Sequence, residues 1–488
     1  MVSQVGASAH GERQHYNVTL AVLITGALAY ALSQTMIAPA IPAIQEDLGA
    51  STTTVTFALT AFLLTASIAT PIAGRLGDMF GKERVLVITL MIFGLGSLVS
   101  AMSHSIELLI AGRAIQGIGG AVFPLSFGII RDEFPREKVA TGIGLISATF
   151  GIGGGAGLVL SGVIVDHLAY EWIFWLALIV VAIAVVTTHL FVPESPVKSP
   201  AKIDWGGAAL LAAALTSLLV AVSEGDSWGW GSPAFLGLLA AAAVFTATWL
   251  RYEVRQPEPL VDIRMMRQRP VLTTNTAAFL VGFGMFGSYI LIPQFVQVPT
   301  EAGFGFGASV TGAGLFMLPS ALVMLFAGPV SGWMGSRAGS KLPLLIGTVL
   351  ATASFAMLAA WHDTRLSIYV ATTLMGLGIG FAFAAMANLI VEAVDQTQTG
   401  VATGMNTIMR TIGGAIGGQA AASIVSAHTA AGGLPEEAGY TMAFALSAIG
   451  VAFAFVATLF IPGTLSARRT RDAGPSASGG EAPVGAGS

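Results

Sequence analysis

The sequence predicts an all-α integral membrane protein with about fourteen transmembrane helices. Three observations predict this class: few charged residues, many long apolar runs, and basic residues confined to alternate loops. Only 10% of the 488 residues are charged and 54% are hydrophobic, whereas soluble proteins carry roughly 25% charged residues. A chain so poor in charge cannot cover a water-facing surface, so most of its surface must face lipid.

The apolar runs have the length that a bilayer demands, because a spanning helix needs about 20 mainly apolar residues. Fourteen runs meet this condition: 18–40, 52–73, 85–103, 108–130, 139–165, 171–192, 205–222, 234–250, 271–297, 309–330, 342–361, 366–391, 400–427 and 440–462.

The basic residues give the orientation, since Lys and Arg gather in cytoplasmic loops. With the N-terminus inside, 19 of the 22 Lys and Arg residues fall in cytoplasmic segments. Arg365 is the one basic residue in a predicted external loop, and Arg113 and Arg410 lie within spans. We therefore expect both termini on the cytoplasmic side of a bacterial inner membrane.

Three features recur at nearly one offset, which indicates a duplicated six-helix unit. The segment 74–82 recurs at 332–341, Gly117 recurs at Gly376, and the glycine-rich run at Gly153 recurs at Gly413. Both loop copies fall on one side, so the repeat is parallel, which is a transporter architecture. The predicted organisation is a cytoplasmic tail at 1–17, a six-helix bundle at 18–192, a linker with two inserted helices at 193–270, a second bundle at 271–462 and a disordered cytoplasmic tail at 463–488.

The loop 74–84 joins two spans with almost no slack. Its Asp78 is expected to accept hydrogen bonds from a neighbouring helix N-terminus or a basic side chain, in one conformation and not in another. A basic topological anchor is the simpler reading of the loop. The loop resembles the signature of the major facilitator superfamily, through Gly74, Gly77, Asp78, Gly81, Lys82 and Arg84. That resemblance implies gating roles for Asp78 and Arg84.

The extra helix pair makes the chain similar to the fourteen-helix drug:proton antiporter branch, as do Pro293, Gln297, Gly314 and Pro319. This branch usually has an acidic residue in the first helix, where Ser33 stands here. No acidic residue falls in the middle third of a predicted span. The resemblance implies proton coupling, while the residues offer only Asp47, Asp166, Glu224, Asp226 or His189 as poorly placed alternatives.

Two arginines lie inside predicted spans, where an arginine costs about 2.5–3.5 kcal/mol on insertion scales. Arg113 requires a water-filled cavity, an acidic partner or backbone carbonyls, unless it snorkels to the interface. Its segment resembles the family's fourth-helix motif, which implies a role in proton transfer. Arg410 is expected to face the central cavity or to pair with a polar group such as Asn406, with a structural anchor as the alternative.

The fifth span carries glycines such as Gly153 and Gly157, whose spacing lets two helices approach closely. The resemblance implies a coupling role for this stretch, although Leu158 stands where the family's antiporters have proline. Polar groups on the apolar spans are the candidate substrate ligands: Gln34, Gln116, Asn275, Tyr289, Gln294, Gln297 and Asn406.

These observations predict a secondary multidrug or antibiotic efflux transporter that works by alternating access and proton antiport. Its expected partners are a small lipophilic or cationic substrate, the proton gradient and the bilayer, with no nucleic acid, cofactor, metal or catalytic residue. The alternatives are an exporter or facilitator of a single endogenous metabolite and a non-transporting membrane receptor. No nucleotide-binding or hydrolase motif occurs with the required context, so an enzyme is not expected.

Overall fold

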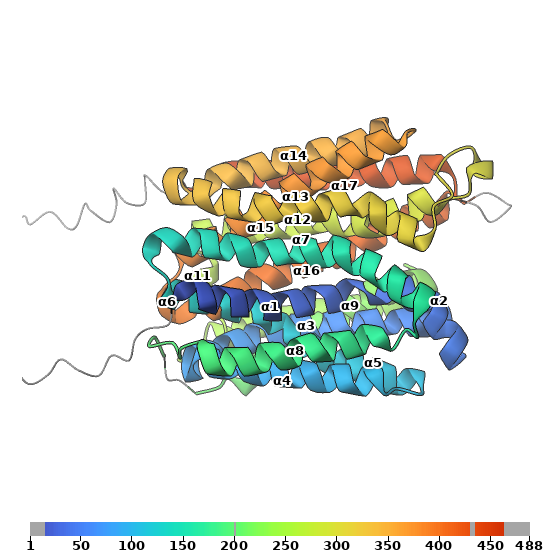
Figure 1. Ribbon diagram of the computed structural model, residues 1–488. Coiled ribbons are helices and arrows are strands. Elements are labelled where there is room, and N and C mark those ends of the chain that lie inside the picture. The colour runs from blue at the N-terminus through green and yellow to red at the C-terminus, as the bar shows by residue number, and fades with distance from the viewer. Residues whose placement is uncertain (1–14, 200–201, 430–434, 463–488) are drawn as a thin grey trace, which may run out of the picture.

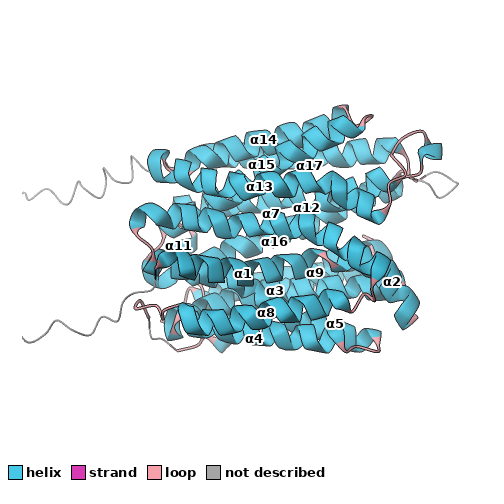
Figure 2. Cartoon of the chain, viewed as in Figure 1, coloured by secondary structure: helices cyan, strands magenta, loops and turns pink. Residues whose placement is uncertain are grey.

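The computed structural model describes residues 15–199, 202–429 and 435–462, and these residues form a bundle of long helices (Figure 1). Helices joined by short loops account for nearly all of the bundle (Figure 2). The predicted C-terminal tail and nearly all of the predicted N-terminal tail lie outside the described residues.

The first half of the chain contains a group of helices that starts with α1 and ends with α8. They are α1 (Tyr16–Thr35), α2 (Ile37–Leu48), α3 (Thr52–Phe80), α4 (Lys82–Ala101), α5 (Ile106–Gly117), the 3-10 turn η1 (Ile118–Ala121), α6 (Val122–Glu133), α7 (Arg136–His167) and α8 (Trp172–Phe191). The first predicted span is divided between α1 and α2, and α5, η1 and α6 together form the fourth span.

The remaining helices are an intervening pair and a second group. They are α9 (Trp205–Trp228), α10 (Pro233–Glu253), α11 (Ile263–Met266), α12 (Arg269–Gln297), η2 (Thr300–Ala302), α13 (Val310–Ala338), α14 (Lys341–Ala360), α15 (Arg365–Ala393), η3 (Gln396–Gln398), α16 (Thr399–Ala427) and α17 (Glu437–Leu459).

The all-α membrane fold predicted from the sequence is confirmed. Among the described residues, 13 helical stretches are long and apolar enough to cross a membrane. The 29-residue α16 has the length but is rich in glycine and threonine, and much of it is buried. A helix surrounded by other helices needs little lipid-facing apolar surface, so α16 is consistent with a fourteenth span.

Buried apolar side chains form separate clusters in the two groups of helices. Phe355 and Phe444 belong to the cluster of α12 to α17. Phe62 and Phe93 belong to a cluster formed mainly by α1 to α8, which also includes Ala387 and Val391 of α15. The pair α9 and α10 packs on a third cluster, which includes Trp249 and residues of α16.

Glycine permits helix contacts that any side chain would block. A Cβ on Gly144 of α7 would lie 2.3 Å from the Gly328 oxygen of α13. A Cβ on Gly413 of α16 would lie 1.9 Å from the Phe279 oxygen of α12. On α1, the Thr35 hydroxyl donates to the Gly153 oxygen of α7 at 2.6 Å. The glycine-rich runs therefore pack tightly against neighbouring helices.

Replacing Gly413 by alanine should destabilise the protein, because the new methyl group must displace the backbone of α12. Overpacking of this kind costs about 1–3 kcal/mol, so the melting temperature of the purified protein should fall. Gly237→Ala is the matched control, since a Cβ there meets nothing within 4 Å. Equal melting temperatures for the two variants would contradict the proposed packing.

Candidate functional site

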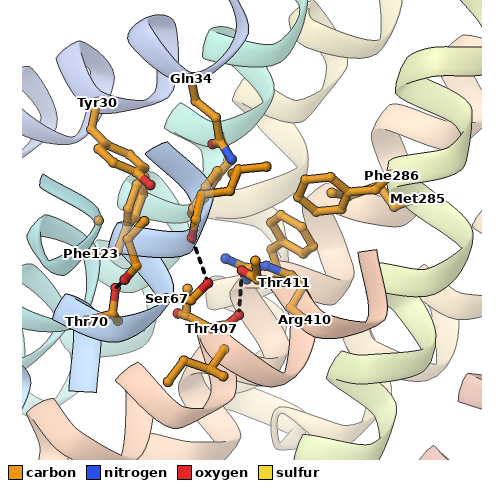
Figure 3. Close-up of a pocket in the computed structure, with 16 residues that line it drawn as sticks. Tyr30, Gln34, Ser67, Thr70, Phe123, Met285, Phe286, Thr407, Arg410 and Thr411 are labelled. Atoms are coloured by element: carbon orange, nitrogen blue, oxygen red, sulfur yellow. Dashed lines mark hydrogen bonds between the residues drawn. The ribbon is translucent and has the colours of Figure 1, made fainter. Parts of the chain in front are cut away.

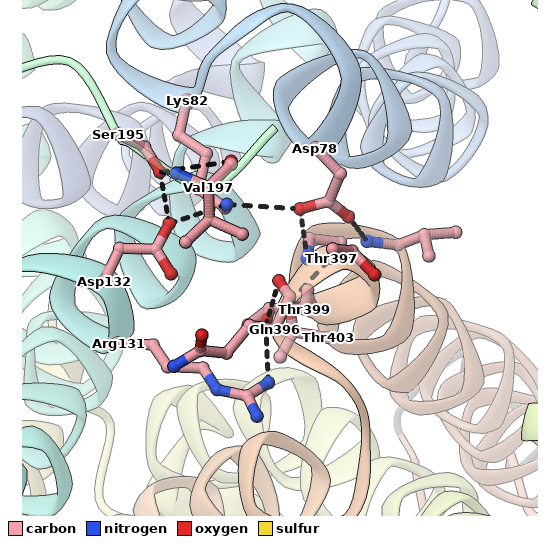
Figure 4. A network of polar contacts seen from close by, with 12 residues as sticks. Asp78, Lys82, Arg131, Asp132, Ser195, Val197, Gln396, Thr397, Thr399 and Thr403 are labelled. Atoms are coloured by element: carbon pink, nitrogen blue, oxygen red, sulfur yellow. Dashed lines mark hydrogen bonds and ion pairs between the residues drawn. The ribbon is translucent and has the colours of Figure 1, made fainter. Parts of the chain in front are cut away.

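Most of the polar contacts between the two groups of helices lie at one end of the bundle. We call this end the terminal face, because α1 begins and α17 ends there, and the other end the far face (Figure 1). Asp78 lies in the last turn of α3, and its carboxylate accepts hydrogen bonds from the backbone N–H groups of Gly400 and Val401, both at 3.2 Å. Figure 4 shows this contact across the gap between α3 and α16.

The Asp78 contact places a carboxylate at a helix N-terminus, where free N–H groups and the helix dipole favour negative charge. Glycines allow the approach, since a Cβ on Gly74 would lie 2.5 Å from the Gly400 oxygen. The hydrogen bonds expected for Asp78 are thus present, while its gating role remains a prediction.

Lys82 holds two buried carboxylates together. Its Nζ lies 2.7 Å from Oδ2 of Asp132 and 3.5 Å from Oδ1 of Asp78, and all three side chains are fully buried. The Ser195 hydroxyl also donates to Asp132. Two carboxylates and one ammonium leave an excess negative charge, which the N-terminus of α16 partly neutralises.

Arg131, at the end of α6, makes a second connection across the halves. Its guanidinium donates to the Val394 oxygen at 2.7 Å, the Asp395 oxygen at 3.1 Å and the Thr399 hydroxyl at 2.6 Å. It therefore joins the segment between α15 and α16 to α6. The Thr397 amide and hydroxyl donate to the Asp395 carboxylate and hold its pKa below the usual range.

We call the contacts of Asp78 and Arg131 with α16 and its preceding segment the terminal-face closure. Nothing in the sequence distinguishes Arg131 from the other basic residues near the ends of helices. Arg84, which the family resemblance linked to gating, is exposed and makes none of these contacts.

A small cavity of about 30 Å³ is lined by residues of both groups of helices (Figure 3). Its residues on α16 follow Gly400 and Val401 along the helix, so the cavity lies farther from the terminal face than the closure. Aromatic rings and hydroxyls dominate its wall. The residues that line the cavity include Tyr30, Gln34, Phe123, Phe150, Phe286, Phe383, Thr407, Arg410 and Thr411. Of the seven predicted substrate ligands, only Gln34 lines this cavity.

Arg410 extends from α16 to the cavity and is only 7% exposed. Its guanidinium carbon lies 4.1 Å from the centre of the Phe383 ring and 4.7 Å from that of Phe150. The expected pairing with Asn406 is wrong, because the Asn406 amide donates instead to Asn275 at 2.9 Å. That bond holds Asn406 against α12, and the alternative expectation, that Arg410 faces the cavity, is confirmed.

Arg113 is fully buried, which excludes snorkelling. It donates to the Ser33 oxygen at 3.2 Å and to Gln116 at 2.7 Å, and it lies 4.0 Å from the centre of the Phe62 ring. The backbone-carbonyl alternative is therefore the observed one. Gln116 in turn donates to Ser97 at 2.7 Å, so its amide is engaged within the first group of helices.

The other predicted ligands lie elsewhere. Tyr289 packs against Gly154 of α7, and Gln294 and Gln297 line an open hollow near the far face. Sequence reasoning missed the threonines of the cavity because threonine is common in apolar helices. The sequence pattern that indicates them is the spacing of four residues between Thr407 and Thr411, which places both hydroxyls on one face of the helix near Arg410.

One group of side chains has spacing compatible with a metal ion, and it lies at the far face. His362, Asp363 and Glu437 have candidate ligand atoms within 4.8 Å of one another. The His362 ring contacts the Leu358 oxygen and the Glu437 carboxylate at 2.7 and 2.8 Å. The sequence could not reveal this group, because Glu437 is 75 residues from His362.

Residues 23–418, most of the chain, match the family described as Major Facilitator Superfamily. The chain belongs to the major facilitator superfamily. Members of that family are multi-pass membrane transporters and not enzymes. The human organic anion transporter MFSD10 has a similar structure, with a TM-score of 0.67 and 18% identity, over 91% of this chain and 99% of that chain. That likeness shows the fold alone.

Relatives in bacteria are about 30% identical. An uncharacterized MFS-type transporter of Mycobacterium tuberculosis is 30% identical over 79% of this chain and 56% of that protein, so the chain spans little more than half of its length. The tetracenomycin C resistance and export protein of Streptomyces glaucescens is 30% identical over 79% of this chain and 71% of that protein. Multidrug resistance protein 3 of Bacillus subtilis is 29% identical over 74% and 70%, respectively.

Asp78→Asn should weaken the terminal-face closure, because a neutral amide is a poorer partner for the helix N-terminus and for Lys82. Losing a hydrogen bond to a charged group costs about 1.5–3 kcal/mol, enough to shift a two-state equilibrium about tenfold or more. Spin labels at Phe80→Cys and Gln396→Cys, both exposed positions in a chain without other cysteines, should report longer distances in this variant.

Glu137→Gln is the control for Asp78→Asn, since Glu137 is an exposed acid on the same face. It should leave the distance distribution unchanged. An unchanged distribution in Asp78→Asn as well would show that the carboxylate does not hold the closure.

Proposed function

We propose that this superfamily member is an efflux transporter that exports small, largely apolar molecules by alternating access. The observation that carries the proposal is a cavity between two groups of helices, shut on one side by hydrogen bonds that can break. The groups at 18–192 and 271–462 would rock about the cavity, with 193–270 as the inserted linker. Such motion is the usual mechanism for transporters with two repeats.

The proposed orientation has the terminal face in the cytoplasm of a bacterial cell, with the chain in the inner membrane. The support is the charge distribution, because 19 of the 22 Lys and Arg residues fall in the segments that the sequence predicts to be cytoplasmic. In this orientation the described conformation is closed to the cytoplasm. Substrate would enter after the terminal-face closure breaks and leave from the far face.

The composition of the cavity wall suits a drug-sized substrate, but the cavity is too small to hold one. Ligand pockets are commonly about 300–1,000 Å³, whereas the cavity measures about 30 Å³. The two groups must therefore separate to admit such a molecule. The aromatic wall and the printed functions of the relatives, multidrug resistance and tetracenomycin C export, support a lipophilic substrate and membership of the drug-exporting branch.

We propose proton antiport as the energy source, with Asp78 as the group whose charge opens and shuts the closure. Among the described residues, no carboxylate lines the cavity. Protonated Asp78 is a weaker acceptor for Gly400 and Val401, so proton binding would favour opening. The close contacts of Gly153 with Ala31, and of Gly157 with Thr35, would transmit movement between α7 and α1, and Arg113 would move with α1 through Ser33.

Export of one endogenous product is the alternative that a specific comparison favours. The tetracenomycin C relative exports a single antibiotic by its printed name. A broad resistance profile would support multidrug efflux, while protection against one compound would support the alternative.

Inverted membrane vesicles should accumulate lipophilic dyes when the lumen of the vesicles is made more acidic than the outside. Collapse of the gradient by an ionophore should abolish the accumulation, because antiport needs downhill proton movement. Dye fluorescence measures the flux, and vesicles without the protein are the control. Dye flux that does not depend on the proton gradient would contradict antiport and indicate facilitated transport. Dye binding without any dye flux would indicate a receptor.

A further inference from the structure

We propose that the central cavity binds an organic anion with an aromatic body, and that Arg410 holds its anionic group. The inference deepens the proposed function and rests on it for the direction of transport. It departs from the cationic substrate that the family resemblance implied. Binding itself can be measured without transport.

Arg410 is a buried cation without an anionic partner. Among residues 15–199, 202–429 and 435–462, no carboxylate forms a salt bridge with it. Its observed partners are the faces of Phe150 and Phe383. These rings stabilise the cation but leave the five N–H donors of a guanidinium without strong acceptors.

The charges around the cavity do not compensate Arg410. Arg113, the other arginine buried within the spans, donates to the Ser33 oxygen and lies over the Phe62 ring, on which Tyr30 stacks. The buried carboxylates Asp78 and Asp132 lie at the terminal-face closure instead. The cavity therefore has a positive potential in a region of low dielectric constant, where charge interactions are strong.

The remaining wall suits the rest of an amphipathic anion. A carboxylate or sulfonate matches the fork of a guanidinium and accepts two hydrogen bonds from it. Thr411 lies beside Arg410 and Gln34 points into the cavity from α1, as Figure 3 shows. Phe286 and Phe123, which stacks on Phe150, line the cavity and provide apolar surface for an aromatic body. A cation in the same position would meet a like charge and no acceptor of opposite charge.

The purified full-length protein can test this with two dyes that share a xanthene skeleton, carboxyfluorescein as the anion and rhodamine 6G as the cation. Fluorescence anisotropy measures both affinities without a gradient. Carboxyfluorescein should bind about tenfold or more tightly than rhodamine 6G, as expected for a charge-assisted bidentate contact.

Arg410→Gln should weaken carboxyfluorescein binding about tenfold or more, while Arg410→Lys should retain part of the affinity because the charge remains. Arg337→Gln is the control, since Arg337 is exposed on the terminal face and stacks on Trp333. It should bind like the original protein. Melting temperature and size-exclusion profile establish that each variant is folded.

Tighter binding of rhodamine 6G, or equal carboxyfluorescein affinity in the original protein and folded Arg410→Gln, would overturn the inference. If Arg410→Gln does not fold, the dye preference of the original protein and the affinity of Arg410→Lys still decide it. Anion binding without export would leave the site intact and refute efflux. Export of rhodamine 6G without anion binding would refute the site and leave efflux intact.

Discussion

The structure depends on one constraint: an ionised group surrounded by hydrocarbon must find its partners within the protein. Two buried carboxylates, Asp78 and Asp132, lie near the place where α3 meets the start of α16. There Asp78, Lys82 and Asp132 neutralise one another in part, and the free N–H groups of a helix supply the rest. Because those N–H groups belong to the other half, satisfying this cluster also closes the molecule.

The two repeats use their matching loops differently. In the second half, Ser336 stands at the position of Asp78, so that loop has no carboxylate to reach across. Lys341 donates to the Leu459 and Ile461 oxygens at the end of α17, within its own half. The facing contact between α7 and α13 depends on close backbone packing, as at Gly144 and Gly328. Beside it, Asn388 of α15 donates to the Ala140 oxygen of α7 at 3.2 Å. The interface between α3 and α16 thus contains a carboxylate, whereas the interface between α7 and α13 depends on backbone packing. A change in proton binding therefore acts on the interface between α3 and α16.

The centre of the molecule has the opposite balance of charge. Arg113 uses a backbone carbonyl, a glutamine and an aromatic ring in place of an acid, and Arg410 uses two rings. Rings and carbonyls lower the cost of burying a cation without cancelling its charge. A transporter built in this way keeps negative charge at its closure and positive charge at its cavity. The positive charge at the cavity then contributes to selecting the substrate.

The sequence by itself determined the class of fold, because hydropathy and helix length depend on neighbouring residues along the chain. It also identified Arg113 and Arg410 as costly groups that need a partner, since burial of a charge is penalised wherever it occurs, and Asp78 as an acceptor for a helix N-terminus or a basic side chain. Only the tertiary structure decided which partner each one has. Asp78 and Gly400 are 322 residues apart, and Arg410 meets Phe150 rather than the nearby Asn406, because the contacts depend on how helices from the two halves pack. Periodicity along one helix does not contain that information.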